Sequence, residues 1–269
     1  MDIAALNQNL GPRLALLMNK LKESLATYGF STERIERIFS LTLSVLEENK
    51  DKIPEILADD IRAFRERDPA ATSDEEVMLL YSGFHALEAH RIAYVLHQKG
   101  YTFEARAISQ VAKFITGVEI HPGARIGRGL VIDHGAAVVI GETAEIGDNC
   151  TLYQGVTLGG TGKDTGKRHP TLGNNVLVGS GAKVLGPFRV GDNAKIAAGA
   201  VVLKEIPANC TAVGIPARIV RNGKEKAAEN LDQIHTPDPV QKELLRLSKR
   251  IEMLEARLAA AERRRSDET

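Results

Sequence analysis

The chain has 269 residues, a length that fits one or two domains and is too short for three. Lysine and arginine together number 35, and so do aspartate and glutamate, so the formal net charge is zero and nucleic acid is not expected as a partner. Hydrophobic residues make up 43% of the chain and charged residues 26%, which is typical of a globular protein and excludes a disordered one.

The chain has two cysteines, Cys150 and Cys210, which are too few for a disulfide framework or a cysteine-based zinc site. We expect both to be small buried side chains. The N-terminus lacks the basic-then-apolar order of a signal peptide, and no apolar run approaches the ~18 residues of a membrane span. We therefore expect a cytoplasmic protein with no membrane partner.

Residues 1–117 are expected to form a helical domain, because apolar residues recur there at spacings of three and four. Ser31 or Thr32 can cap one helix, and Pro54 fits the first turn of the next. The Asp68-Pro69 dipeptide ends that helix, since the residue before a proline is pushed out of the α region.

Two more helices are expected before the pattern changes. Ser73 and Glu76 fit a capping box, which predicts one long helix that continues to about Gln98. A last helix is expected over residues 103–116.

A period of six residues begins after these helices, in thirteen blocks that each open on an aliphatic residue. Six is the repeat of the hexapeptide β-helix, in which three blocks make a triangular coil and the aliphatic residues stack inside it. We expect a left-handed parallel β-helix over residues 118–220, so the fold class is α+β. The blocks open at Ile120, Ile126, Ile132, Ile140, Ile146, Leu152, Leu158, Leu172, Val178, Val184, Val190, Ile196 and Val202.

Two of the thirteen blocks break the period. The block at 132–139 has two extra residues and contains His134, and the block at 158–171 has eight extra and contains His169. Insertions in a solenoid tend to gather on its binding face. The two interruptions therefore predict where the functional site lies.

A C-terminal coiled-coil helix is expected over residues 239–265, after a polar linker at 221–238. Apolar residues alternate spacings of three and four along it, with Leu244, Ile251 and Leu258 at heptad position a and Val240, Leu247, Leu254 and Ala261 at position d. The pairs Arg250–Glu255 and Arg257–Glu262 have the spacing of interhelical g-to-e contacts, which favours parallel chains in register. The alternative is a single amphipathic helix that packs on the protein's own surface.

Residues 60–220 resemble the serine O-acetyltransferase family. The motifs that carry the resemblance are Arg67-Asp68-Pro69, GFHALEAHRI, IHPGARIGRG, DHG, VVIGETA, VTLGGTGK, KRHP and VGIPARIV. The resemblance implies an enzyme of cysteine biosynthesis that moves an acetyl group from acetyl-CoA to the hydroxyl of L-serine, giving O-acetylserine and CoA. It implies acetyl-CoA as a cosubstrate, with no permanently bound cofactor and no metal.

The resemblance also implies the catalytic pair. Histidine has a suitable pKa for the general base that a serine hydroxyl needs, and His134 is the candidate. A carboxylate usually orients such an imidazole, and the matching position here is Glu119, where many family members carry aspartate.

The family's substrate pocket corresponds to four residues of this chain. Arg168 is expected to bind the serine carboxylate with its bidentate fork, and His169 to lie beside it in the pocket. Asp68 and Asp133 are expected to bind the ammonium group and hold the hydroxyl. The expected partners are the substrates, L-cysteine as feedback inhibitor, and copies of the same chain in a homotrimer or a dimer of trimers, with His134 and His169 acting from different chains. The expected acetyl-CoA contacts are Gly160, Thr161, Ser180, Ala198 and Arg218, along the groove between neighbouring β-helices.

The resemblance leaves other interpretations open. We do not expect docking to cysteine synthase, because the chain ends in Ser266-Asp267-Glu268-Thr269. The resemblance implies that this partner binds a tail that ends in isoleucine. The main alternative function is a hexapeptide acyltransferase that acts on a sugar or another amino alcohol. A further alternative is a zinc carbonic anhydrase on the same fold, which needs three histidines as metal ligands. This chain lacks the third one, since residues 173–175 are Gly-Asn-Asn. A non-enzymatic trimeric scaffold would not explain why both interruptions carry histidine.

Overall fold

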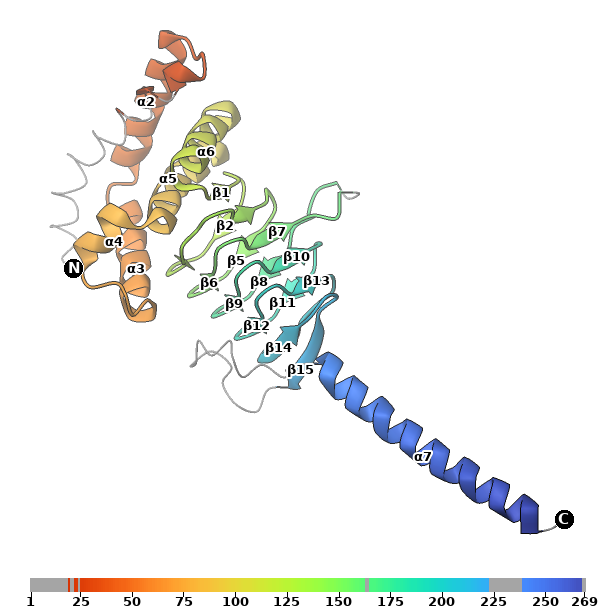
Figure 1. Cartoon of the computed structure of the whole chain (residues 1–269). Coiled ribbons are helices and arrows are strands. Elements are labelled where there is room, and N and C mark those ends of the chain that lie inside the picture. The colour runs from red at the N-terminus through yellow and green to blue at the C-terminus, as the bar shows by residue number, and fades with distance from the viewer. Residues whose placement is uncertain (1–18, 20–21, 24, 163–164, 223–238, 268–269) are drawn as a thin grey trace. The chain divides into compact units, whose positions relative to one another are not determined.

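The structure is a computed structural model that describes residues 19, 22–23, 25–162, 165–222 and 239–267. The chain forms two compact units, residues 1–233 and 234–269. The first unit contains five described helices followed by three stacks of short strands (Figure 1). The second unit contains one described helix, α7 (Pro239–Asp267).

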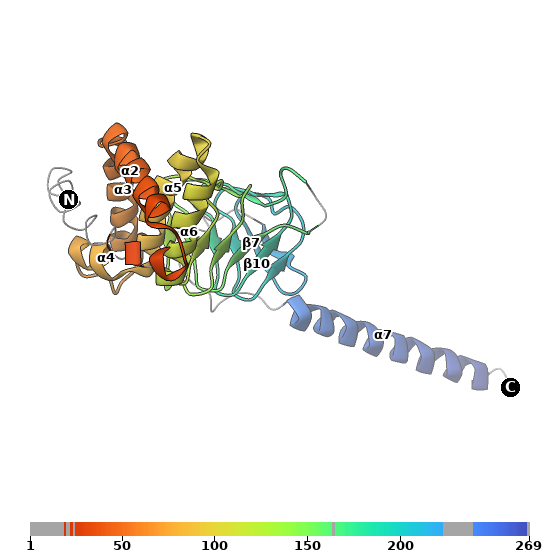
Figure 2. The ribbon, with the colours of Figure 1, turned by 90° about the horizontal axis from the view of Figure 1, so that it is seen from above.

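The helices of the first unit gather at the end of the β-helix where its first strands lie (Figure 2). Ser31 caps α2 by accepting a hydrogen bond from the backbone N–H of Arg34, and Pro54 lies in the first turn of α3. Helix α3 ends directly before Asp68, as predicted. The spacing of Leu14, Leu17, Leu21 and Leu25 also predicts a helix before α2, and that segment lies mostly outside the described residues. The bounds are α2 Thr32–Glu48, α3 Lys52–Arg67, α4 Asp74–Leu80, α5 Ser82–Gln98 and α6 Thr102–Thr116.

The prediction of one long helix from Ser73 to Gln98 is wrong. The chain forms two helices, α4 and α5, because Tyr81 between them has an extended backbone with φ −84° and ψ 112°. Ser73 does cap α4, by accepting from the N–H of Glu76 at 3.0 Å. The break places the Tyr81 hydroxyl 2.8 Å from the carboxylate of Asp68, a tertiary contact that a continuous helical spacing does not reveal.

The repeat region forms three sheets, here called A, B and C, and the chain visits them in that order in each of the first four coils. Among the described residues of the last coil the chain has no strand in sheet B, and Ile206 forms only an isolated bridge to Val190. Sheet A contains β1 (Glu119–Ile120), β4 (Val139–Ile140), β7 (Thr157–Gly159), β10 (Lys183–Leu185) and β13 (Val201–Val202). Sheet B contains β2 (Arg125–Ile126), β5 (Glu145–Ile146), β8 (Thr171–Leu172) and β11 (Arg189–Val190). Sheet C contains β3 (Val131–Ile132), β6 (Thr151–Leu152), β9 (Leu177–Val178), β12 (Lys195–Ile196), β14 (Cys210–Val213) and β15 (Arg218–Asn222).

The parallel register of the sheets confirms the six-residue repeat. The residues that open the blocks pair directly from coil to coil, as in Ile120 with Ile140 and Ile140 with Leu158. Twelve of the thirteen are buried and Ile126 is half-buried against the same core. Two neighbouring parallel strands must be joined by a long connection. Here that connection is the part of the coil that passes through the other two sheets. Among the described strands, only the last one, β15, runs antiparallel to its neighbour β14.

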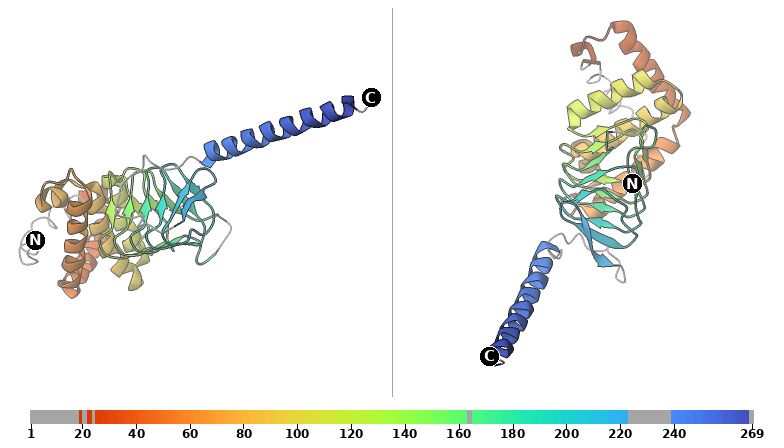
Figure 3. Two further views of the ribbon diagram at one scale, coloured as in Figure 1. Left: turned by 90° about the horizontal axis from the view of Figure 1, so that it is seen from below. Right: turned by 90° about the vertical axis from the view of Figure 1, so that its right-hand side faces the viewer.

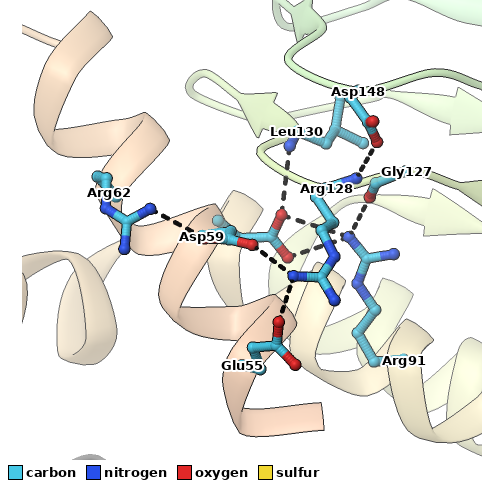
Figure 4. A network of polar contacts seen from close by, with 9 residues as sticks. Glu55, Asp59, Arg62, Arg91, Gly127, Arg128, Leu130 and Asp148 are labelled. Atoms are coloured by element: carbon cyan, nitrogen blue, oxygen red, sulfur yellow. Dashed lines mark hydrogen bonds and ion pairs between the residues drawn. The ribbon is translucent and has the colours of Figure 1, made fainter. Parts of the chain in front are cut away.

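A polar network joins α3 and α5 to the first coil (Figure 4). The buried carboxylate of Asp60 accepts from Arg91 at 3.1 Å and from the backbone N–H of Leu130 at 3.2 Å. Arg91 also donates to the carbonyl groups of Ile126 and Gly127, both at 2.6 Å. Removing one partner of such a buried ion pair leaves an unpaired charge, so the network fixes how the helices sit on the coil.

Helix α7 is one continuous helix (Figure 3). Leucine and isoleucine side chains are exposed along its described part. Among the described helices, none combines the length and the apolar character that crossing a bilayer requires. Cys150 and Cys210 are both buried and unbridged, as expected, and burial raises the pKa of the Cys150 thiol to about 12. The expected linker at 221–238 lies outside the described residues, apart from its first two residues at the end of β15.

Candidate active site

The corners of the coil position the predicted site residues on two edges of sheet A. Asp133 and His134 lie in the corner between β3 and β4, on the edge where sheet C leads into sheet A. Arg168 and His169 lie between β7 and β8, on the edge where sheet A leads into sheet B. We call these the C–A edge and the A–B edge. The two histidine-bearing interruptions are therefore separated by the width of sheet A within one chain.

The two extra residues of the first interruption turn the chain at His134. His134 has a positive φ of 58°, a conformation that is uncommon for residues other than glycine. Its carbonyl accepts a hydrogen bond from the Ser82 hydroxyl at 3.1 Å. The residue after Ser82 is Gly83, and a Cβ at this position would collide with the carbonyl of Ile132. The first turn of α5 thus presses directly against this corner and holds it.

The imidazole of His134 itself points into solvent, with 70% of the side chain exposed. Its Nδ1 lies 3.8 Å from Asp133 Oδ1, which is too long for a hydrogen bond. Glu119, the predicted orienting carboxylate, is instead paired with Lys113 of α6. Within the described part of one chain, neither carboxylate forms a hydrogen bond with the ring of His134.

An acidic pair lies beside this corner. Asp68, at the end of α3, accepts from the Tyr81 hydroxyl at 2.8 Å and from the backbone N–H of Ala70 at 2.8 Å. Burial raises the pKa of Asp133; the charge of His134 opposes this rise and the charge of Asp68 adds to it. Burial and the hydrogen bond to Asp68 raise the pKa of Tyr81 to about 12. Among the described residues no lysine or arginine is paired with either aspartate, so the pair suits an incoming cation.

The A–B edge is organised around the hydroxyl of Thr143. This oxygen accepts from the backbone N–H groups of Arg168 at 3.0 Å and His169 at 3.1 Å. Both the hydroxyl and the backbone N–H of Thr143 approach His169 Nδ1, at 2.9 Å and 3.2 Å. Gly141 leaves room for the His169 ring, because a Cβ there would collide with it.

These contacts determine which nitrogen of His169 carries the proton. A backbone N–H can only donate, so Nδ1 is an acceptor and the proton lies on Nε2. Burial, with the charge of Arg168 adding to it, lowers the pKa of His169 and keeps the ring neutral. His169 is thus a fixed hydrogen-bond donor. The neighbouring Arg168 guanidinium contacts the carboxylate of Glu142, which lowers the pKa of Glu142.

Sequence reasoning missed several residues that build the two edges. Thr143 and Glu142 lie inside the VVIGETA motif, and Ser82 and Gly83 lie at or beside GFHAL. These residue types are common at turns and helix starts, so their presence alone does not mark a site. One signal could have indicated them: each residue lies in or beside a motif that carries the family resemblance, yet has no role assigned from the sequence.

The predicted acetyl-CoA residues do not form one cluster in a single chain. Ser180 and Ala198 lie on the C–A edge in successive coils, where the N–H of Gly199 donates to the Ser180 carbonyl at 2.8 Å. Gly160 and Thr161 lie on the A–B edge, in the segment that leaves β7. The remaining candidate, Arg218, is exposed on β15. Ser180 and Ala198 thus lie on the same edge as His134, and Gly160 and Thr161 lie on the same edge as His169.

Comparison with known proteins gives consistent matches. A family model described as "Serine acetyltransferase, N-terminal" matches residues 12–89, and one described as "Bacterial transferase hexapeptide (six repeats)" matches residues 169–204. The serine acetyltransferase of Synechococcus elongatus is 54% identical over 203 residues, which cover 75% of this chain and 82% of the relative.

Solved structures with bound ligands are also similar. The Neisseria gonorrhoeae serine acetyltransferase in complex with serine superposes with a TM-score of 0.67 at 35% identity, covering 82% of this chain and 94% of that one. A serine acetyltransferase in complex with cysteine gives 0.69 at 39% identity, with coverage of 77% and 82%. The Brucella abortus serine acetyltransferase in complex with coenzyme A gives 0.68 at 38% identity, with coverage of 81% and 93%.

Proposed function

Because this chain belongs to the serine acetyltransferase family, we propose how its two edges divide the work of that reaction. The protein is a serine O-acetyltransferase of cysteine biosynthesis, an enzyme that acetylates the hydroxyl of L-serine to give O-acetylserine. The coenzyme A complex of the Brucella abortus relative supports acetyl-CoA as the acetyl donor.

The two edges form one active site between neighbouring chains. The placement of His134 and His169 on opposite edges of sheet A carries this proposal. A contact between the C–A edge of one chain and the A–B edge of another joins two different surfaces. Contacts of this heterologous kind generate rings, and the smallest ring that is not a twofold dimer has three chains. The assembly is a homotrimer with three shared sites.

The acidic pair binds the ammonium group of serine. Asp68 and Asp133 are close enough for the charge of one to raise the pKa of the other, and an ammonium between them relieves that repulsion. From the neighbouring chain, His169 donates through Nε2–H and Arg168 offers its fork of N–H groups to the serine carboxylate. The pocket thereby recognises both charged groups of an amino acid, which favours serine over a sugar as acceptor.

His134 is the general base. Its imidazole takes the proton of the serine hydroxyl as the oxygen attacks the thioester carbonyl of acetyl-CoA. When the intermediate collapses, the C–S bond breaks and the coenzyme A thiolate takes the proton back from the imidazolium. Glu119, held by Lys113, supplies a negative charge in the same first coil that favours this imidazolium.

The pantetheine arm of acetyl-CoA lies in the groove between two β-helices. Ser180 and Ala198 face it from one chain, Gly160 and Thr161 from the next, and Arg218 meets its phosphates. L-Cysteine has the same ammonium and carboxylate groups as serine and competes for the same pocket, in line with the cysteine complex of a relative. It is therefore a competitive feedback inhibitor.

Mixing two inactive variants tests the shared site. At a serine concentration low enough that each variant alone is inactive, co-expression of His134→Ala and His169→Asn chains in equal amounts restores about a quarter of wild-type activity per site, because one interface in four combines two intact edges. Activity is measured as serine-dependent release of thiol from acetyl-CoA, with each variant alone as the control. If co-expressed chains stay as inactive as either parent while forming mixed trimers, each site belongs to one chain and the proposal is wrong.

A further inference from the structure

Helix α7 presents an apolar seam that the proposed active site does not use. Within its described side chains, the seam consists of the a and d residues Leu244, Leu247, Ile251, Leu254 and Leu258, which are between 44% and 61% exposed. The other seam residues, Val240 and Ala261, have side chains outside the described ones. Most of the stability of a helix in a protein comes from packing its apolar face, so a continuous apolar row on this 29-residue helix marks a surface that another molecule covers.

We infer that α7 forms a parallel, in-register, three-stranded coiled coil with the α7 helices of two other copies of this chain. The seam has the heptad spacing of such a coil, in which each a or d side chain inserts between four residues of a partner. The inference that three helices associate rests on the proposed trimer. The inference that α7 associates with other copies of itself does not depend on that proposal. A trimer brings three tails together, which raises their effective concentration and lets about three heptads suffice.

The charges that flank the seam favour the parallel arrangement. Arg250 at position g and Glu255 at position e have no ion-pair partner among the described residues. They are five residues apart, so they do not face each other on one helix, where neighbours are three or four apart. In parallel chains in register, Arg250 of one helix faces Glu255 of the next.

The mixture of residues along the seam does not choose the number of strands by itself. Position a holds leucine at 244 and 258 and isoleucine at 251, and position d holds leucine at 247 and 254. Patterns that specify two, three or four strands use one residue type at each position. The number of strands follows instead from the proposed trimer, which brings three α7 helices together.

Disulfide trapping in the full-length protein tests the coil. The native cysteines, Cys150 and Cys210, are buried, so a single new cysteine reports on α7 alone. Leu247→Cys is the seam variant, and Leu245→Cys is the matched control, because Leu245 is also an exposed leucine but lies at position b, off the seam. Added diamide takes two electrons and two protons from each pair of thiols that forms a disulfide.

The trapped fraction reports both orientation and strand number. In parallel chains position 247 meets itself and crosslinks, and a plateau at about two-thirds of the chains marks three strands, since one thiol in each trio stays unpaired. A plateau near completion refutes three strands. Equal crosslinking of both variants, or none of Leu247→Cys, refutes the coil. If crosslinking reaches two-thirds but co-expression of the two inactive variants restores no activity, the shared active site is refuted and the coiled coil is not.

Reversing the charge at position 250 is an independent test, because its effect on stability is opposite in a single helix and in the coiled coil. In a single helix Arg250→Glu is favourable, because position 250 is four residues from Arg246 and the substitution replaces a repulsive pair with an attractive one. In the coil the same substitution places a second carboxylate against Glu255 of the next chain, and trapping at position 247 falls about twofold for each pair lost. Adding Glu255→Arg restores trapping. A rise in trapping, or no recovery in the double variant, contradicts the coil.

Discussion

His134 and His169 interrupt the same repeat, yet their surroundings are opposite. The His134 side chain is 70% exposed and has no hydrogen bond to its ring among the described residues, whereas His169 is 8% exposed and its Nδ1 is occupied by Thr143. A ring that must gain and lose a proton in each cycle needs access and freedom. A ring that only donates a hydrogen bond gains from being fixed and neutral. The difference supports the proposal that the C–A edge carries the chemistry and the A–B edge recognises the substrate.

Removing the exposed ring is expected to have the largest effect. His134→Ala lowers kcat by roughly two to four orders of magnitude, since a positioned general base contributes about that much. The protein is expected to keep its fold and its assembly, because the exposed ring contributes little to the packing of its own chain. Serine-dependent thiol release measures activity, and sedimentation measures assembly. Near wild-type turnover would remove His134 from the mechanism and erase the contrast between the edges.

Loosening the buried ring is expected to act on binding instead. Thr143→Val keeps the shape but removes the oxygen that accepts from Arg168 and His169. The serine KM rises about tenfold, since each buried donor left unpaired costs about 1–3 kcal/mol, and kcat changes less. Thr143→Ser keeps the hydroxyl and serves as the control. An effect confined to kcat would place Thr143 and His169 with the chemistry.

A smaller effect separates the two edges further. Glu119→Gln lowers kcat by about threefold to tenfold with little change in the serine KM, because the lost charge favoured the imidazolium. Arg168→Lys has the reverse pattern, since a point charge does not replace the fork of a guanidinium. Arg168→Lys also weakens inhibition by cysteine by about the same factor as it raises the serine KM. Kinetics with serine and cysteine varied separately measure both, and an exchange of the two patterns would mean that the roles are misassigned.

The smallest expected effect concerns stability and pH. The raised pKa of Asp133 means that the folded protein binds this proton more tightly than the unfolded chain. Stability is therefore lost as pH rises through the window between the ordinary pKa of aspartate and the raised value. Asp133→Asn raises the melting temperature by roughly 1–3 °C at neutral pH while it impairs serine binding. The gain should vanish below the ordinary pKa, and a gain that is independent of pH would contradict this origin.

The sequence predicted the β-helix well because its signal is a repeat. Every inward position, such as Ile140 or Val184, satisfies the same local rule, so errors do not accumulate. The break at Tyr81 was missed, because it follows from a contact with Asp68 that no local spacing contains. Likewise, the family motifs located His134 and His169, but their bracing by Ser82 and Thr143 depends on distances across the fold.

The close approach of Gly83 to Ile132 has a consequence for how the protein is made. Helices α2–α6 leave the ribosome before the first coil, and N-terminal parts of a chain generally fold first during synthesis. The corner that carries His134 then closes on a helix end that is already in place, which acts as a template for the first turn of the solenoid. Later coils copy the register of the one before. A change at Gly83 therefore harms biogenesis before it harms the finished enzyme, through a first coil that starts in the wrong register.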